Sequence, residues 1–336
     1  MADASAVLQT TDSGLYCPAG DFFIDPWRPV PRALVTHAHA DHAREGSEGY
    51  LCAEPSVPLL RRRFADGAPI QGLPYGERLR LGSATVSFHP SGHLLGAAQV
   101  RVETDEGVWV FSGDYKRAAD PTCAPFEVVR CDTFITEATF ALPLYRWEPP
   151  EVTVREVLAW WDANREAGRA SILFCYTLGK AQRLLAELAR LTDRTVFVHG
   201  ALDAMVACYR EAGVRMLPTA RVVDVPKGSS FAGELVLAPL SARGTVWMRR
   251  LQPFQQAFAS GWMQLRGPRR QRNFDRGFPL SDHADWPALL DTVAETGAER
   301  VLVTHGFAEP LARHLREDRG LDARVLRTPF VGEAED

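Results

Sequence analysis

Short apolar runs along this chain repeatedly stop at a polar side chain that can bind a metal. The runs are rich in β-branched and aromatic residues, which favours strands over helices. They occupy residues 33–36, 84–88, 108–111, 133–136 and 300–304, and they lead into His37, His93, Asp114, Glu137 and His305, respectively. We therefore expect a functional site built along one edge of a sheet scaffold.

The pattern changes between about residues 149 and 267. Helical periodicities at 152–165, 181–191 and 201–213 alternate with apolar runs at 171–175 and 195–198. Strands that alternate with helices predict βαβ units and a parallel sheet. The segments LPLYRWEPP and GPRRQRNFDRG, on either side of this region, have the composition of connections between domains. The sequence thus predicts an inserted domain, and a first domain that is discontinuous.

Composition is that of an ordinary globular protein, with 46% hydrophobic and 24% charged residues among 336. No apolar run approaches the length of a membrane span, and the N-terminus lacks the pattern of a signal peptide, so we expect a cytoplasmic protein without membrane association. Six cysteines without a CxxC pair predict reduced thiols. The net charge of −4 argues against a surface that coats nucleic acid everywhere, but it leaves room for a local basic groove.

The densest group of candidate ligands is VTHAHADHA, residues 35–43, which places His37, His39, Asp41 and His42 directly after an apolar run. Imidazole and carboxylate groups suit zinc, or manganese and iron in the same geometry. Lone histidines are more often surface or core residues, and His89, His199 and His314 are interpreted in that way. Four ligand-type side chains within six positions favour a metal site.

The spacing HxHxDH is suited to two neighbouring ions. On an extended or tightly turning loop, His37 and His39 can point to one side, where we expect His93 to complete a first metal site. We expect Asp41 and His42 to face a second position with His305, and Asp114 to be shared by both ions. Two metals about 3.5–4 Å apart form the arrangement that clamps the attacking and leaving oxygens in phosphoester hydrolysis.

Taken together, these motifs resemble a known family. THAHADHA resembles the HxHxDH motif of the metallo-β-lactamase superfamily, and Asp25, His93 and Asp114 follow the order of its other motifs. Glu137, SDHAD around His283 and VTHG around His305 resemble the three further motifs of the β-CASP nucleases. CYTLGKAQ and ASGWM are similar to segments of that family's inserted domain. YCPAGDFFIDPWRPVPRALVTHAHADHA is most similar to the bacterial exonucleases associated with DNA ligase, and the resemblance spans residues 15–306.

The resemblance implies an α/β fold, an αββα sandwich that carries the metals, interrupted by an inserted β-CASP domain. It divides the chain into a first part of the metallo-β-lactamase domain at 1–145, the β-CASP domain at 146–270 and the second part at 271–336. It implies catalytic roles for four residues. Asp25 would orient a ligand, Asp41 would act with the metals, His283 would donate a proton to the leaving oxygen, and Glu137 would hold the imidazole of His283.

Two features of the inserted region suggest contacts with a nucleic-acid strand. Thr177, Gly179 and Lys180 stand between a predicted strand and a predicted helix, where a phosphate can bind, although ordinary helix capping explains the same pattern. Arginines and aromatic residues before His283 suit a groove for a single strand, with a solvated loop as the equal alternative. These residues are Arg266, Arg269, Arg270, Arg272, Phe274, Arg276 and Phe278.

The sequence-based hypothesis is a two-metal DNA exonuclease, with zinc or manganese, that hydrolyses single strands or frayed ends from the 5′ terminus. The resemblance adds a repair context with a DNA ligase and a helicase. An RNA-processing β-CASP ribonuclease is the alternative, because His305 is retained in the manner of the RNA-directed members. A small-molecule hydrolase is disfavoured by the inserted domain and SDHAD. A catalytically inactive nucleic-acid-binding scaffold is disfavoured because every ligand is present.

Overall fold

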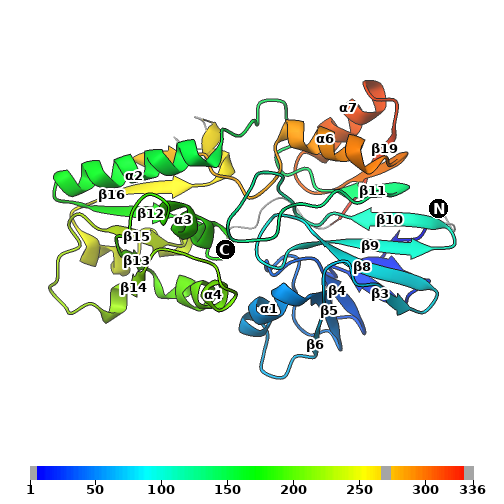
Figure 1. Cartoon of the computed structure of the whole chain (residues 1–336), viewed down its shortest axis with the longest axis horizontal. Coiled ribbons are helices and arrows are strands. Elements are labelled where there is room, and N and C mark those ends of the chain that lie inside the picture. The colour runs from blue at the N-terminus through cyan, green and yellow to red at the C-terminus, as the bar shows by residue number, and fades with distance from the viewer. Residues whose placement is uncertain (1–5, 266–273, 329–336) are drawn as a thin grey trace. The chain divides into compact units, whose positions relative to one another are not determined.

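The computed structural model describes residues 6–265 and 274–328 (Figure 1). Within these residues, contacts divide the chain into two compact units. Unit 1 comprises 6–119, 123–146 and 283–328, and unit 2 comprises 120–122, 147–265 and 274–282. The predicted domain boundaries at 145/146 and 270/271 remain predictions. Residues 274–282 lie with unit 2 because the strand at 276–278 pairs with a strand of that unit.

Unit 1 contains two sheets. The first runs in the order β1-β2-β3-β4-β5-β6, with strands Gln9–Thr10, Leu15–Cys17, Phe22–Ile24, Ala33–Val35, Tyr50–Ala53 and Ile70–Leu73. The second runs in the order β19-β18-β11-β10-β9-β8-β7. Its strands are β7 Leu79–Leu81, β8 Ala84–Pro90, β9 Ala98–Thr104, β10 Gly107–Phe111, β11 Thr133–Thr136, β18 Arg300–Val303 and β19 Asp322–Val325.

Alternation of side chains along the strands builds two cores in unit 1. Trp109, Phe111 and Ile135 point to one face of the second sheet and pack with Leu34 and other apolar residues of the first sheet. The intervening Val110 joins a different cluster on the opposite face. Because successive strand residues point to opposite sides, one apolar run supplies both cores. This explains why β10 and β11 read as apolar runs without polar interruption.

Helices complete the layers of unit 1. α7 (Ala308–Glu317) packs against β18 and β19, and apolar residues of α6 (Trp286–Thr296) join the core on the outer face of the second sheet. α1 (Val57–Arg63) packs beside β6, at the first sheet, after the 3-10 turn η1 (Glu54–Ser56). Helices therefore flank two stacked sheets, which confirms the predicted αββα sandwich (Figure 1).

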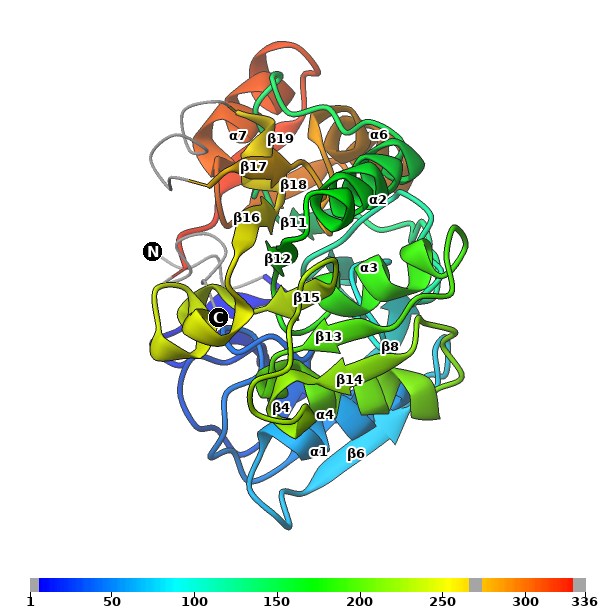
Figure 2. The ribbon, with the colours of Figure 1, turned by 90° about the vertical axis from the view of Figure 1, so that its left-hand side faces the viewer.

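Unit 2 is built on a six-stranded sheet in the order β14-β13-β15-β12-β16-β17, in which every strand pair is parallel (Figure 2). The strands are β12 Ala170–Phe174, β13 Val196–Val198, β14 Thr219–Arg221, β15 Leu235–Ala238, β16 Phe254–Ala259 and β17 Arg276–Phe278. The helices are α2 Pro150–Glu166, α3 Lys180–Leu188 and α4 Gly200–Glu211, with 3-10 turns η2 Val222–Asp224, η3 Leu240–Ala242, η4 Val246–Leu251 and η5 Gly261–Gln264. The predicted βαβ units and parallel sheet are confirmed.

Apolar residues cover both faces of this parallel sheet, as its buried strands require. Leu173 of β12 packs with Trp161 of α2 and Leu184 of α3 on one face. Ile172 and Phe174, its neighbours along the strand, pack on the other face with Met248 and other residues of the 3-10 segments. All six cysteines lie in the described residues and are free thiols, as predicted. Within the described residues, none of the helices has both the length and the apolar composition of a transmembrane helix.

Candidate metal centre

The predicted ligands of unit 1 come from strand ends in both sheets. His37 follows β4 of the first sheet, whereas His93, Asp114 and His305 follow β8, β10 and β18 of the second. The expectation of a site along one edge of a single sheet was therefore too simple. β8, β10, β11 and β18 all run in the same direction, so their carboxyl ends lie on one edge of the second sheet. The loop after β4 brings its histidines to that edge from the other layer.

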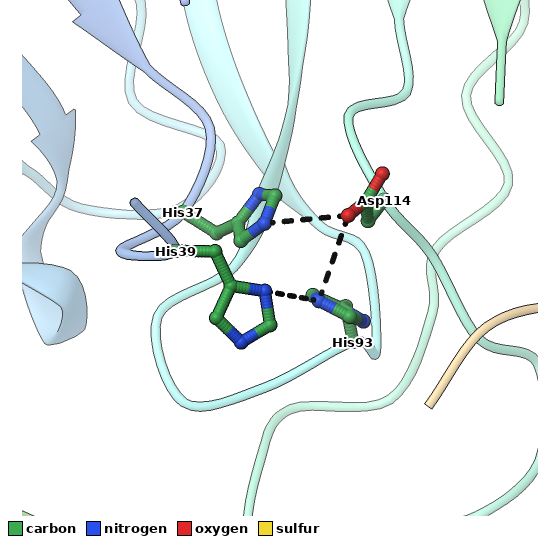
Figure 3. Close-up of side chains that lie close together, drawn as sticks. All are labelled: His37, His39, His93 and Asp114. Atoms are coloured by element: carbon green, nitrogen blue, oxygen red, sulfur yellow. Dashed lines mark hydrogen bonds and ion pairs between the residues drawn. The ribbon is translucent and has the colours of Figure 1, made fainter. Parts of the chain in front are cut away.

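Four of the predicted ligands form a compact group, with one ligand atom from each within 4.8 Å of the others (Figure 3). They are His37, His39, His93 and Asp114. Nε2 of His93 lies 3.1 Å from Nδ1 of His39. Oδ2 of Asp114 lies 3.5 Å from Nε2 of His37 and 3.8 Å from Nε2 of His93. The structure thus brings together the set predicted for the first metal.

The distance between His37 and Asp114 fits a shared cation better than a direct hydrogen bond. Two ligand atoms at 2.0–2.2 Å from a tetrahedral ion are roughly 3.4 Å apart. The 3.5 Å between His37 and Asp114 is close to this value, and it is longer than a good hydrogen bond between these groups. Nε2 of His37 is also fully buried and has no hydrogen-bond partner among the described residues. A divalent metal would satisfy that nitrogen, so the residues present fit the ion that the sequence predicted.

The second predicted set shares Asp114 with the first. Nε2 of His42 lies 3.5 Å from Oδ2 of Asp114 and 3.8 Å from Oδ2 of Asp41. The ring of His305 stacks on that of His42, with centroids 5.3 Å apart and an angle of 16° between the planes. Asp41, His42, Asp114 and His305 therefore lie together, although as a set of four they are less compact than the first group.

Asp25 contacts both His42 of this second set and Thr36, the residue that follows β4. Its Oδ1 accepts a hydrogen bond from the backbone N–H of Thr36 at 2.8 Å, and its Oδ2 accepts one from the Thr36 hydroxyl at 2.6 Å. The same Oδ2 lies 2.7 Å from Nδ1 of His42. A carboxylate at Nδ1 fixes the proton there and leaves Nε2 as the unprotonated nitrogen, which is the form that binds a metal. Asp25 thus contacts the predicted ligand His42, and its orienting role stays a prediction.

Burial and crowding of these groups change their pKa values. Burial, reinforced by the neighbouring His42 and His93, lowers the pKa of His37 well below its usual range. Burial, reinforced by His42, likewise lowers the pKa of His305 to about 3. Burial also raises the pKa of Asp114 to about 7, against the effect of His42. Neutral imidazole is the form that ligates metals, so burial prepares His37 and His305 for this role.

His42 behaves differently because carboxylates surround it. Burial alone would lower its pKa, but Asp114, Asp41 and Asp25 raise the pKa of His42 to about 10. In the protein without metal, this imidazole therefore carries a proton between the carboxylates. Binding of a cation at Nε2 replaces that proton, so metal binding by this set releases protons to solvent.

Glu137 and His283 form a separate buried pair beside Asp114. Nδ1 of His283 lies 2.9 Å from Oε2 and 3.1 Å from Oε1 of Glu137. Glu137 also accepts hydrogen bonds from the backbone N–H of Tyr115, at 2.7 Å, and from the hydroxyl of Thr139. The carboxylate is therefore held in place and contacts the ring of His283, and the catalytic roles that the resemblance implies for these two residues stay predictions. One ligand-type atom from each of Asp114, Glu137 and His283 lies within 4.8 Å of the others.

Two of these residues adopt backbone conformations that are rare outside glycine. Asp25 has a φ of 42° and His305 a φ of 59°. Such left-handed conformations cost about 1–3 kcal/mol and are concentrated at functional sites. Both residues are buried and aim a polar group at the same cluster. The surrounding structure therefore maintains strain at the positions that set the geometry of the centre.

The predicted phosphate site in unit 2 has a different structure. Gln182, in the first turn of α3, accepts a hydrogen bond from the N–H of Gly179 at 2.7 Å and donates one to the carbonyl of Thr177 at 2.9 Å. Nζ of Lys180 is buried and pairs with Asp282 at 2.9 Å. This is helix capping, the alternative interpretation of the pattern. We do not propose a phosphate contact for Lys180, because its ammonium group already has partners inside the unit.

The residues predicted to form a single-strand groove lie partly outside the described residues and partly in the cores of unit 2. Arg266, Arg269, Arg270 and Arg272 lie outside the described residues. Phe274 and Phe278 are buried in the two cores of unit 2 and cannot stack on bases. Arg276 lies 3.7 Å from Glu156. For Phe274 and Phe278 both interpretations, a groove and a solvated loop, were therefore wrong, because an apolar residue beside arginines also suits a core position.

Sequence reasoning did not identify Thr36, although it makes two hydrogen bonds to Asp25. It also missed a buried cluster in unit 2 formed by Asp120, Arg183 and Asp282 with Lys180. A signal for Asp282 was present, since it lies inside SDHAD. Nothing in the local pattern around Asp120 or Arg183 distinguishes these residues from ordinary surface charges.

Comparisons with known proteins agree with this architecture. A protein of Opitutus terrae named as a probable DNA ligase is 32% identical over 93% of this chain, which corresponds to 30% of that protein. A ribonuclease of Thermus thermophilus is 30% identical over 50% of this chain and 44% of its own length. A solved structure of a protein of unknown function from Enterococcus faecalis V583 has a TM-score of 0.58 and 12% sequence identity. The match covers 90% of this chain and 78% of the other chain. At this identity, the similarity shows the fold alone. No family model matches the sequence. The chain spans less than half the length of either curated relative.

Proposed function

We propose that this chain, which belongs to the β-CASP group of metallo-β-lactamase-fold proteins, is a two-metal phosphodiesterase that degrades DNA from 5′ ends. The main support for hydrolytic activity is that His37, His39, His93 and Asp114 form a group beside the Glu137–His283 pair. Ligands for metal ions and a proton-transferring imidazole are the two components that phosphodiester hydrolysis requires. Zinc and manganese suit these imidazole and carboxylate ligands.

His37, His39, His93 and Asp114 would hold one ion, and Asp41, His42 and His305 would share Asp114 with a second. Bound ions would supply positive charge for the phosphate oxygens and lower the pKa of water for attack. The remaining work falls to the chain's own residues. Asp25 fixes the tautomer of His42, and Asp114 lies between the two histidine sets.

His283 is proposed as the proton donor to the leaving oxygen. Its Nδ1 faces the carboxylate of Glu137, so a proton on Nδ1 is retained by that hydrogen bond. Nε2 is then the nitrogen from which a proton is transferred. The carboxylate also stabilises the imidazolium form that must exist before the transfer. Glu137 is therefore a positioning residue, and His283 the catalytic one.

The relative named as a DNA ligase supports DNA as the substrate, because its similarity extends over nearly the whole chain. Its additional length also supports a functional link between this chain and a DNA ligase in repair, whereas the link to a helicase rests on the family resemblance alone. The 5′ direction and the preference for single-stranded or frayed ends rest on the family resemblance. RNA processing is the second candidate, and the ribonuclease of Thermus thermophilus, similar over half of the chain, favours it.

Matched DNA and RNA strands of one sequence, labelled at either end and incubated with manganese or zinc, test this proposal. A 5′-labelled DNA strand should release its label at once as a short product, and a 3′-labelled strand should shorten gradually. Asp41→Ala should abolish both reactions, whereas Asp21→Ala, at an exposed carboxylate of the same unit, should not. Faster cleavage of RNA than of DNA would favour the second candidate, and a ladder from the 5′-labelled strand would contradict the direction.

A further inference from the structure

Unit 2 contains a buried cluster of four charged side chains. Lys180 and Arg183 lie on α3, one turn apart, and both are 1% exposed. Asp282 is 5% exposed and directly precedes His283 in the chain. Asp120 completes the cluster, with 3% of its side chain exposed. Four side chains of this chemical type buried together require a physical explanation.

Lys180 holds the segment that leads to His283 at two points. Its Nζ lies 2.9 Å from Oδ2 of Asp282 and donates a hydrogen bond to the carbonyl of Leu280 at 3.0 Å. One of these acceptors is a side chain and the other is backbone. The ammonium group therefore restrains both the position of residue 282 and the path of the chain before it.

Arg183 holds the same segment from the next turn of α3. Its Nη1 donates to the carbonyl of Ser281 at 2.7 Å and to Oδ1 of Asp282 at 3.0 Å. Its Nε lies 3.4 Å from Oδ2 of Asp120, which stands six residues after Asp114. With Lys180, three consecutive residues, 280 to 282, are thus bound to a single helix.

Stability alone does not account for this arrangement. Removing charges from water is costly, and well-packed apolar residues at such positions are often as stabilising as a buried ion pair. What the hydrogen bonds of this buried cluster add is a fixed geometry, because both carboxylate oxygens of Asp282 and two backbone carbonyls have defined partners. The segment made rigid in this way ends at the residue before the proposed proton donor.

We propose that Lys180 and Arg183 are positioning residues for His283, acting through Asp282 and the backbone of residues 280–282. This inference rests on the proposed function. Glu137 contacts the ring of His283 through Nδ1, while the cluster holds residues 280–282, which directly precede His283 in the chain. Both restraints are needed, because a misplacement of about 1 Å can lower a rate on the order of 10²-fold.

The central experiment measures kcat and KM for Lys180→Met on labelled DNA. The substitution removes the ammonium group and keeps the length of the side chain. We expect kcat to fall roughly 10²-fold with KM changed less than about threefold and metal content unchanged. Arg190→Met, at an exposed residue just beyond the same helix, is the matched control and should behave as the unmodified chain. An unchanged kcat for Lys180→Met would overturn the proposal.

Measuring Lys180→Met in a chain that already carries His283→Ala distinguishes a positioning role for Lys180 from a general disturbance of the structure. If Lys180 acts through His283, Lys180→Met should cost little further activity in a chain that already carries His283→Ala. Equal losses in both backgrounds would show that Lys180 acts by another route, and the proposal would fail. Lys180→Met combined with Asp282→Asn should recover thermal stability, because no unpaired buried charge remains, while kcat stays low. Recovery of kcat together with stability would show a merely structural role.

Failure of the positioning inference can be distinguished from failure of the proposed function by a measurement that does not depend on activity. If the unmodified chain hydrolyses neither DNA nor RNA, the proposed function fails, and the positioning inference is tested by NMR of the ring nitrogens. Lys180→Met should then shift the signals of His283, identified by their loss in His283→Ala, and Arg190→Met should leave them in place. Identical His283 signals in Lys180→Met and the unmodified chain would overturn the inference without reference to activity.

Discussion

Replacing Asp25 by asparagine should weaken metal binding by changing which nitrogen of His42 carries its proton. Asp25 is 1% exposed and accepts hydrogen bonds from the N–H and the hydroxyl of Thr36. Its Oδ2 also lies 2.7 Å from Nδ1 of His42. Asparagine has the same shape, but only one of its two terminal atoms accepts hydrogen bonds. The substitution therefore tests the chemistry of the position with little change in packing.

The magnitude follows from these three contacts. The amide oxygen can replace Oδ1 and accept the N–H of Thr36, and the hydroxyl of Thr36 can rotate to accept an N–H of the amide. In the neutral ring, the form that binds a metal, Nδ1 of His42 must then accept the second amide hydrogen, so the single proton of the imidazole lies on Nε2, which faces Asp114. A protonated Nε2 cannot bind a metal. Loss of such an orienting partner typically costs 10–100-fold in metal affinity, or about 1.4–2.7 kcal/mol.

Metal affinity is measured by competition with a chelating dye, and the tautomer by NMR of the His42 ring nitrogens. Asp21→Asn is the control, since Asp21 is an exposed aspartate that also has a positive φ, of 49°. It should bind metal as the unmodified chain does. Affinity of Asp25→Asn within twofold of the unmodified chain, or a proton still on Nδ1 of His42, would refute the reasoning.

Three further outcomes are expected. Elemental analysis of chain purified without chelator should give two divalent metals per molecule, because seven candidate ligands are too many for one tetrahedral ion; one ion at saturation would contradict this. His283→Ala should lower kcat roughly 10²–10⁴-fold with both metals retained, whereas His305→Ala should weaken the second metal; the reverse pattern would exchange their roles. Gly113→Ala should destabilise the chain by about 1–3 kcal/mol, measured by thermal unfolding, because residue 113 has a φ of +54° and the added Cβ would lie 2.8 Å from Cβ of Thr36. Stability equal to that of the unmodified chain would contradict this contact.

Strand ends were the most predictable part of this protein. A buried strand reads as a short apolar run, and the residue at which it stops is visible in the sequence. For β10 and β11 the sequence therefore indicated both the strand and the polar residue after it. The parallel sheet of unit 2 was predictable for the same reason, since strong helical patterns separate β12 from β13.

Contacts between distant segments were not predictable from local patterns. Arg183 and Lys180 lie on a helix whose pattern of apolar residues did not require buried charges, and their partner Asp282 is about 100 residues away. Phe274 is a second residue whose position could not be predicted from the local pattern. Arginines around an aromatic residue suit either a nucleic-acid groove or a core position, and only the tertiary contacts with Phe258 place it in the core.

Asp25 and Glu137 perform the same physical task at two places in unit 1. Each is a buried carboxylate held by backbone and hydroxyl donors, and each faces Nδ1 of one histidine. For His42 this leaves Nε2 directed at Asp114, at a distance suited to a shared ion. The local motif is therefore the same for a proposed ligand and for a proposed acid. What separates the two roles is the surroundings of Nε2, and these depend on which other strand ends the sandwich brings alongside.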